Sequence, residues 1–147
     1  MAQPGAGSGP VESVEYALMK RADVERLRDA LQSAPADVLA AYLYGSRARG
    51  TPSPDSDVDL GVLLKAPPAA TLSNAARDLE ATVERALALP VEVVVVNTAP
   101  ADLVHRILRD GIILLDRDRA ARLRFEVQSR NEYFDLEPVR RRYRQPA

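Results

Sequence analysis

Residues 44–62 read YGSRARGTPSPDSDVDLGV, and this segment decides the fold. A Gly-Ser pair ends an apolar run, and Asp57 and Asp59 then flank Val58 at the start of an alternating segment. Residues i and i+2 of a strand point the same way, so these carboxylates are expected within roughly 7 Å of each other. Two such anions repel, and each favours its protonated form unless a cation is present. The segment therefore predicts a hard divalent cation such as Mg²⁺, which binds carboxylate oxygens, water and phosphate.

A simpler interpretation of this pair, a solvated loop without a metal, stays open. Asp-rich loops often enter strands, and Asp55 makes the run DSDVD partly a solvated segment. From the residues alone, Asp57 and Asp59 fit a metal site and a solvated loop about equally well.

Glu92 is the third acidic residue of interest. It is the only charged residue in PVEVVVVN (residues 90–97), a run typical of a strand buried on both faces. An isolated carboxylate in an apolar core costs on the order of several kcal/mol or is neutralised. A metal shared with the two aspartates would remove that cost. Alternatively, Glu92 lies at the solvated start of its strand, just after Pro90.

The Gly45-Ser46 pair fits the same site. Glycine after a strand lets the main chain approach a ligand closely, and a helical turn from Ser46 would present N–H groups and a hydroxyl to a phosphate. The pair ends one strand, and the next strand along the chain carries the carboxylates. This combination is much more specific than its parts.

The rest of the chain alternates helical and strand patterns. We expect strands over 38–44, 57–64, 91–96 and 112–115, with a turn over 46–49 and a loop over 50–54 between the first two. Helices are expected over 14–33, with a break near 22–23, over 69–89 and over 101–110, the last with a cap over 97–100. An arginine-rich helix over 118–144, which Pro138 could kink, follows. The predicted fold class is α+β, a small mixed sheet of three to four strands backed by helices. Residues 1–10 are expected to be a disordered tail and residues 11–147 a single domain.

Composition limits the class of function. A chain of 147 residues is the size of one domain, and a net charge of −1 argues against a general nucleic-acid binder. The lack of cysteine excludes disulfides and thiolate metal sites and favours a reducing cytoplasm. No apolar run approaches the roughly 18 residues of a membrane span, and the start lacks a signal-peptide pattern. We therefore expect a cytoplasmic protein without membrane contact or direct nucleic-acid binding.

Other single residues are expected to have structural rather than chemical roles. His105 has no second histidine in the chain, so a histidine metal site is excluded and a packed or surface role is expected. Tyr42 and Tyr44 are interpreted as core and strand-edge residues rather than platforms for base stacking.

Taken together, the motifs resemble those of the nucleotidyltransferase superfamily, and most closely the minimal nucleotidyltransferases of prokaryotes. GSRARG at 45–50 and SDVDL at 56–60 match the signature, and VEVVVV, NTAP, ILRDGIILL and RFE…YFD resemble later segments. The resemblance covers about residues 24–143. The third acid of the family is usually aspartate, and this chain has Glu92 instead.

The resemblance implies a core like the palm of polymerase β, with helices mainly on one side of the sheet, and transfer of a nucleoside monophosphate from an NTP. Asp57 and Asp59 would hold the nucleotide-bound Mg²⁺, and Asp59 and Glu92 would share a second ion that activates the attacking hydroxyl. Mn²⁺ is a possible substitute for either ion. The implied nucleotide-binding set is Gly45, Ser46, Arg47, Arg49 and Ser56. For the two arginines, a simple surface role is an equal alternative.

The resemblance also implies a partner. Many minimal nucleotidyltransferases are antitoxins that transfer AMP from ATP to a tyrosine of a helical HEPN-domain toxin, a type VII-like pair, so a hetero-oligomer is expected. Arginines and aromatic residues over 118–144 suit an interface, but packing on the chain's own sheet explains the apolar ones equally well. Two other functions stay open: a non-catalytic module that neutralises its partner by contact, and a small-molecule nucleotidyltransferase, for which the chain is short.

Overall fold

The computed structural model describes residues 21–45, 57–66 and 72–144. In these ranges the elements follow in the order α3 (Arg21–Gln32), β1 (Val38–Tyr44), β2 (Val58–Leu64), α5 (Leu72–Leu87), β3 (Val91–Val95), α6 (Ala101–Asp110), β4 (Ile112–Asp116) and α7 (Arg119–Arg144). The expectations for residues 1–20, 46–56 and 67–71 lie outside the described residues.

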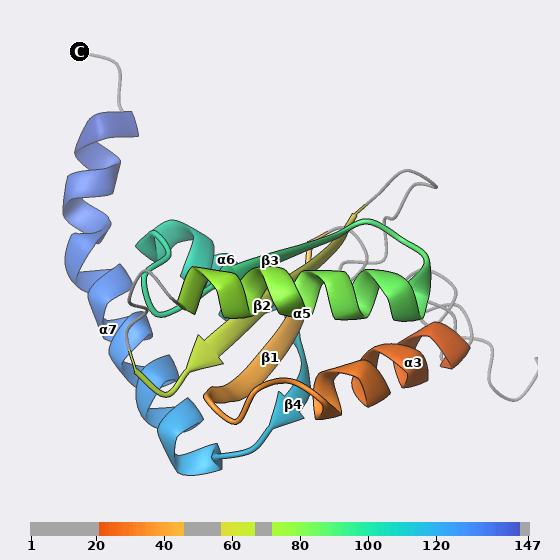
Figure 1. The fold of residues 1–147 in the computed structure, drawn as a ribbon. Helices are drawn as coiled ribbons and strands as arrows, with labels where there is room; N and C mark the ends of the chain where they lie inside the picture. Colours follow the sequence, from red (N-terminus) through yellow and green to blue (C-terminus); the bar gives the residue numbers. More distant parts are fainter. Residues whose placement is uncertain (1–20, 46–56, 67–71, 145–147) are drawn as a thin grey trace, which may run out of the picture.

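The strands of the described part form one sheet in the order β3-β2-β1-β4 (Figure 1). β1 runs antiparallel to β2 and β4, whereas β2 and β3 are parallel. A parallel pair needs a crossover connection, and α5 supplies it between β2 and β3. The mixed, four-stranded sheet with helices packed on it and a long C-terminal helix confirms the predicted fold class.

Helices pack on both faces of the sheet. α3 and α5 bury leucines and valines against one face, among them Leu31, Leu79 and Val83. α6 packs Val104 and Ile107 against the other face, where Phe125 of α7 adds to the same cluster. The expectation of helices mainly on one side is therefore wrong, because α6 and α7 carry an apolar face of their own.

The alternation predicted for residues 57–64 is confirmed. Val58, Leu60, Val62 and Leu64 all lie in the core beneath α3 and α5. Leu63 belongs to the opposite core, beneath α6. Asp59, an even number of residues from Leu63, therefore points to the α6 side of the sheet.

β3 is not buried on both faces, contrary to the prediction. It is an edge strand of the sheet, and Val93 to Val95 are only partly buried. Two glutamates of α5 cover its outer edge: the Val93 N–H donates to Glu80 Oε2 (2.8 Å) and the Val91 N–H to Glu84 Oε2 (3.4 Å). Such contacts satisfy N–H groups that an open strand edge would otherwise present to other chains.

The cap predicted over residues 97–100 is found in that range, but it uses no side chain. Pro100 occupies the N-cap of α6, and no side chain makes a capping hydrogen bond there. Asn97 instead pairs with the main chain of Leu64: the Leu64 N–H donates to Asn97 Oδ1 (2.8 Å), and Asn97 Nδ2 donates to the Leu64 carbonyl (2.9 Å). Its amide thus continues the pairing of β2 and β3 beyond the last strand residues.

Several boundaries differ slightly from the predictions. α5 ends at Leu87, where Ala88 adopts a left-handed conformation with φ 55. α7 begins at Arg119 because Asp118 Oδ1 accepts a hydrogen bond from the Ala121 N–H (3.0 Å), as an N-cap residue does. The helix then continues through Pro138.

Among the described residues, no helix has both the length and the apolar character needed to cross a membrane.

Candidate active site

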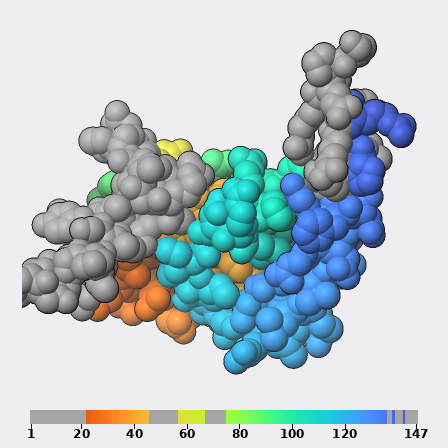
Figure 2. Space-filling model, turned by 180° about the vertical axis from the view of Figure 1, so that it is seen from behind, coloured from red at the N-terminus to blue at the C-terminus, as the bar shows by residue number. Residues whose placement is uncertain are grey.

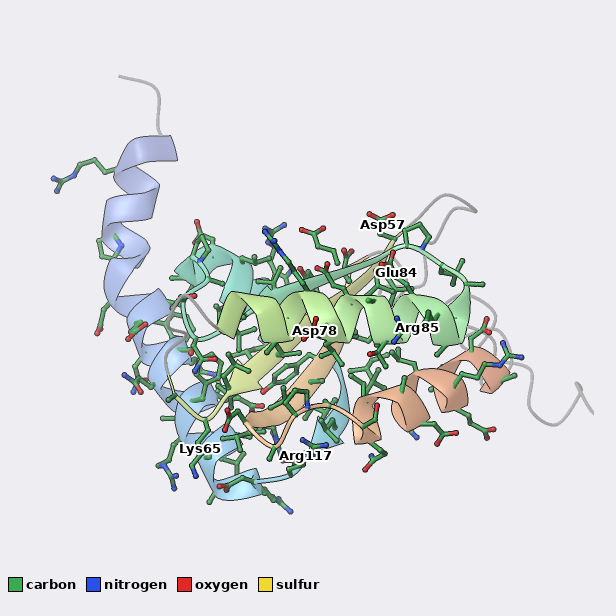
Figure 3. The ribbon with its side chains drawn as sticks, viewed as in Figure 1. Asp57, Lys65, Asp78, Glu84, Arg85 and Arg117 are labelled. Carbon is green, nitrogen blue, oxygen red and sulfur yellow. The ribbon has the colours of Figure 1, made fainter. Side chains whose placement is uncertain are left out.

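Neighbouring strands bring polar side chains together at one end of the sheet. Tyr44 of β1 pairs with Asp59 of β2, and Asp59 pairs with Glu92 of β3. Directly paired residues point to the same face, so these three side chains form a row on the α6 side. Asp57 lies two residues before Asp59 at the same end of the sheet (Figure 3). We call Tyr44, Asp57, Asp59 and Glu92 the acidic row.

The acidic row is open to solvent. Asp57 and Glu92 are exposed, and Asp59 is partly buried. The prediction that Glu92 needs a cation because it is buried is therefore wrong, and the alternative of a solvated strand start describes its environment. The reason is the edge position of β3, since no strand of the described part lies beyond Glu92. An open row is also one that a ligand can reach.

Gly45 brings the main chain directly against the acidic row. Its φ of 79 lies in the left-handed region, which favours glycine. A Cβ atom at this position would overlap Asp59 Oδ2 and crowd the rest of that carboxylate. Close approach of the main chain to a ligand was predicted for Gly45, and the neighbour in the structure is the Asp59 side chain.

Negative charge dominates the electrostatics of the row. Burial, together with the negative charges of Asp59 and Glu92, raises the pKa of Tyr44 to about 12, and Arg106 of α6 opposes them. The phenol therefore stays protonated at neutral pH and is available as a hydrogen-bond donor. A protonated tyrosine adds no further negative charge beside these carboxylates.

Sequence reasoning missed Tyr44 and Arg106 as neighbours of the carboxylates. Tyr44 could have been found, because an antiparallel pairing of strands 38–44 and 57–64 places the end of one beside the start of the other. Arg106 had no local signal, since its position depends on how α6 packs across the sheet.

The row fits a divalent cation by the chemistry of its donors. Among the described residues, no group of three or more histidine, cysteine, aspartate or glutamate side chains is gathered closely enough to hold a metal ion by itself. Mg²⁺ does not need such a cage, since it is commonly held by one or two carboxylates together with water and substrate phosphates. Asp59 and Glu92, paired on adjacent strands, offer that minimal set of oxygen ligands.

The remaining predicted residues divide in two groups. Ser46, Arg47, Arg49 and Ser56 lie outside the described residues. Tyr42 is a core residue, as expected, and its hydroxyl donates to Glu126 Oε2 (2.8 Å). His105 has the packed role that was expected, because its ring stacks on that of Tyr133 with centroids 3.7 Å apart.

Comparison with known proteins establishes the family. Residues 25–120, well over half of the chain, match the family described as polymerase beta, nucleotidyltransferase. The chain therefore belongs to the polymerase beta nucleotidyltransferase family. No curated protein sequence matches it significantly.

Solved structures share the fold. One chain of a toxin–antitoxin complex with AMP-PNP is 23% identical, with a TM-score of 0.68 over 82% of this chain and 94% of that chain. A chain from a complex of a tri-AMPylated Shewanella oneidensis HEPN toxin with an MNT antitoxin is 20% identical, with a TM-score of 0.66 over 85% and 95%. A chain of the MntA–HepT toxin–antitoxin complex is 20% identical, with a TM-score of 0.64 over 82% and 92%. At these identities the likeness shows a common fold.

Proposed function

We propose that this chain is a Mg²⁺-dependent nucleotidyltransferase that transfers AMP from ATP to a tyrosine hydroxyl of a helical HEPN-type toxin. It would thereby act in the cytoplasm as the antitoxin of a toxin–antitoxin pair. The observation that carries the proposal is the acidic row with the Gly45 main chain against it, in a member of a nucleotidyltransferase family. Two similar structures support the choice of ATP as the nucleotide and of a HEPN toxin as the partner, since one holds AMP-PNP and the other a tri-AMPylated HEPN toxin.

The carboxylates of Asp57, Asp59 and Glu92 would hold the metal. When bound, Mg²⁺ neutralises phosphate charge and lowers the pKa of an attacking hydroxyl. Asp57 and Asp59 are assigned to the nucleotide, and Asp59 and Glu92 to the side of the acceptor. The pairing of Asp59 with Glu92 on adjacent strands supports this sharing, because both side chains leave the same face.

The reaction is a substitution at the α-phosphorus of ATP. The tyrosine oxygen of the partner forms a bond to the α-phosphorus. The bond between the α-phosphorus and the oxygen that bridges it to the β-phosphorus breaks, and pyrophosphate leaves. The phenol gives up its proton to solvent. Gly45 and Ser46 are assigned to the β- and γ-phosphates, and the lack of a side chain at Gly45 lets the main chain approach.

The open edge of the site supports an acceptor on another protein. Glu92 is exposed on an edge strand, so the part of the chain that the structure describes leaves this end of the acidic row accessible. A partner surface placed there would position its hydroxyl and exclude water, and both effects favour transfer over hydrolysis.

The direct test uses purified protein, ATP, Mg²⁺ and a HEPN-type toxin, the helical protein that the proposal expects the neighbouring reading frame to encode. We expect the partner to gain the mass of AMP on a tyrosine. The double variant Asp57→Asn/Asp59→Asn should lose this transfer by at least about 100-fold, since it removes charge that positions the nucleotide while keeping side-chain shape. Asp78→Asn is the matched control, because Asp78 is exposed on α5, on the other side of the sheet.

Two results would contradict the proposal. If the double variant transfers AMP as fast as wild type, the acidic row is not the catalytic site. If the complex forms, ATP binds and the toxin is silenced without a change in mass, the chain neutralises its partner by contact alone.

A further inference from the structure

Three large apolar side chains of α7 project into solvent. Leu123 is 41% exposed, Val127 52% and Phe134 58%. With about 3.6 residues per turn, spacings of four and seven residues place them on one side of the helix. Among the residues whose side-chain burial the structure describes, one other large apolar side chain is comparably exposed, Ile113 at 39%. We call Leu123, Val127 and Phe134 the outer stripe.

The opposite side of α7 is already occupied. Arg122 is buried there and donates to Asp116 Oδ2 (2.9 Å) and Glu126 Oε2 (2.7 Å), and Phe125 packs against the core beneath α6. These contacts fix how the helix is rotated on the sheet. The outer stripe therefore cannot turn inward without breaking a buried ion-pair network.

The position of α7 leaves the outer stripe accessible. The helix lies along one side of the molecule beside α6 (Figure 2), and its C-terminal half extends past the sheet and the other helices (Figure 1). Solvent-facing apolar residues that line up over several turns are typical of a surface that another helix covers.

Charge around the stripe indicates the kind of partner. Residues 119–144 contain eight arginines and four acidic residues, which leaves +4 on a helix of a chain whose net charge is −1. Arg119, Arg124 and Arg130 are exposed and lie near the stripe along the helix. Two copies of α7 packed together would set arginine against arginine, whereas acidic side chains on a different protein would be attracted.

We infer that the outer stripe docks an amphipathic helix of the partner, whose apolar side chains cover Leu123, Val127 and Phe134 and whose acidic side chains flank them. This inference rests on the proposed function for the identity of the partner, the helical toxin. Docking on α7 and transfer at the acidic row use different residues, so a variant of the acidic row can lose transfer and keep docking.

The test compares two neighbouring lysine substitutions. Val127→Lys places a charge in the stripe, and Gln128→Lys places the same side chain at an exposed position about 100° around the helix. The probe is the helical protein from the neighbouring reading frame, titrated without ATP. We expect Val127→Lys and Phe134→Lys each to weaken binding about tenfold or more, and Gln128→Lys to leave it within about twofold. Raising the salt concentration should weaken wild-type binding, because arginines attract the acidic flanks.

Each other outcome decides against the inference or separates it from the proposed reaction. If Val127→Lys and Phe134→Lys bind like wild type, or wild type itself does not bind the probe, the docking surface is wrong. If light scattering shows a dimer of this chain that Val127→Lys dissociates, the occupant is a second copy and the inference fails. If the stripe variants lose binding while wild type binds but transfers no AMP, docking is supported and the proposed reaction fails.

Discussion

The two ends of the sheet differ in how they balance charge. Where β4 ends, the Arg117 guanidinium donates to the carbonyl oxygens of Gln32, Ala34, Pro35 and Val38 at 2.8–3.1 Å. At the opposite end, Asp57, Asp59 and Glu92 concentrate negative charge, and no salt bridge with Glu92 forms within the described residues. Figure 3 shows Asp57 at this end and Lys65 and Arg117 at the other.

This difference separates charges that hold the fold from charges that the proposed function assigns to a ligand. Arg117 ties the end of α3 to the start of β1, and nearby Arg122 joins Asp116 to Glu126 of α7, whose carboxylate also accepts from Tyr42. Each of these groups has a partner within the chain. Asp57, Asp59 and Glu92 place like charges at one end of the sheet, which is the arrangement expected where binding, rather than folding, selects the residues.

Removing the buried arginine should have the largest effect on folding. Arg122→Met keeps much of the side-chain volume but leaves Asp116 and Glu126 without their cation, so we expect a loss of about 3 kcal/mol in unfolding free energy. Arg124→Met, an exposed position on the same helix, should change it by less than about 0.5 kcal/mol. Urea unfolding of the three proteins makes the comparison, and equal midpoints would show that the network does not hold α7 to the sheet.

Changes at the open end should affect catalysis and leave folding intact. Glu92→Gln is expected to lower turnover by about 10- to 100-fold with a smaller effect on ATP affinity, because Glu92 is assigned to the acceptor side. The midpoint of urea unfolding should stay unchanged, since Glu92 is exposed. Glu92→Asp then tests the geometry: a faster rate would show that the shorter acid usual in the family is the better ligand. Wild-type turnover in Glu92→Gln would remove Glu92 from the site.

Local patterns were enough to predict most of the fold. The alternation of Val58, Leu60 and Val62 set one face of β2, and α6 has the bounds 101–110 that its periodicity indicated. Such features depend on neighbours along the chain. The gathering of Gly45, Asp57 and Asp59 at one end of the sheet also follows from the sequence, because Gly45 ends one strand and the aspartates begin the next strand along the chain.

What failed depends on contacts between distant segments. Glu92 is exposed because β3 lies at the edge of the sheet, and strand order cannot be read from the run PVEVVVVN. The pairing of Asn97 with Leu64, 33 residues away, was also not predicted. The placement of α6 and α7 on the second face likewise needed the packing of Tyr42 and Phe125 to be known.

The most direct test of the account is a calorimetric titration of ATP into the protein with and without Mg²⁺. If the acidic row is a cation-dependent nucleotide site, wild type and Asp78→Asn should bind ATP only when Mg²⁺ is present, and Asp57→Asn/Asp59→Asn should not bind detectably. The double variant should remain folded, which circular dichroism checks, because asparagine keeps the shape of each aspartate side chain. Unchanged Mg²⁺-dependent ATP binding by the folded double variant would contradict the account.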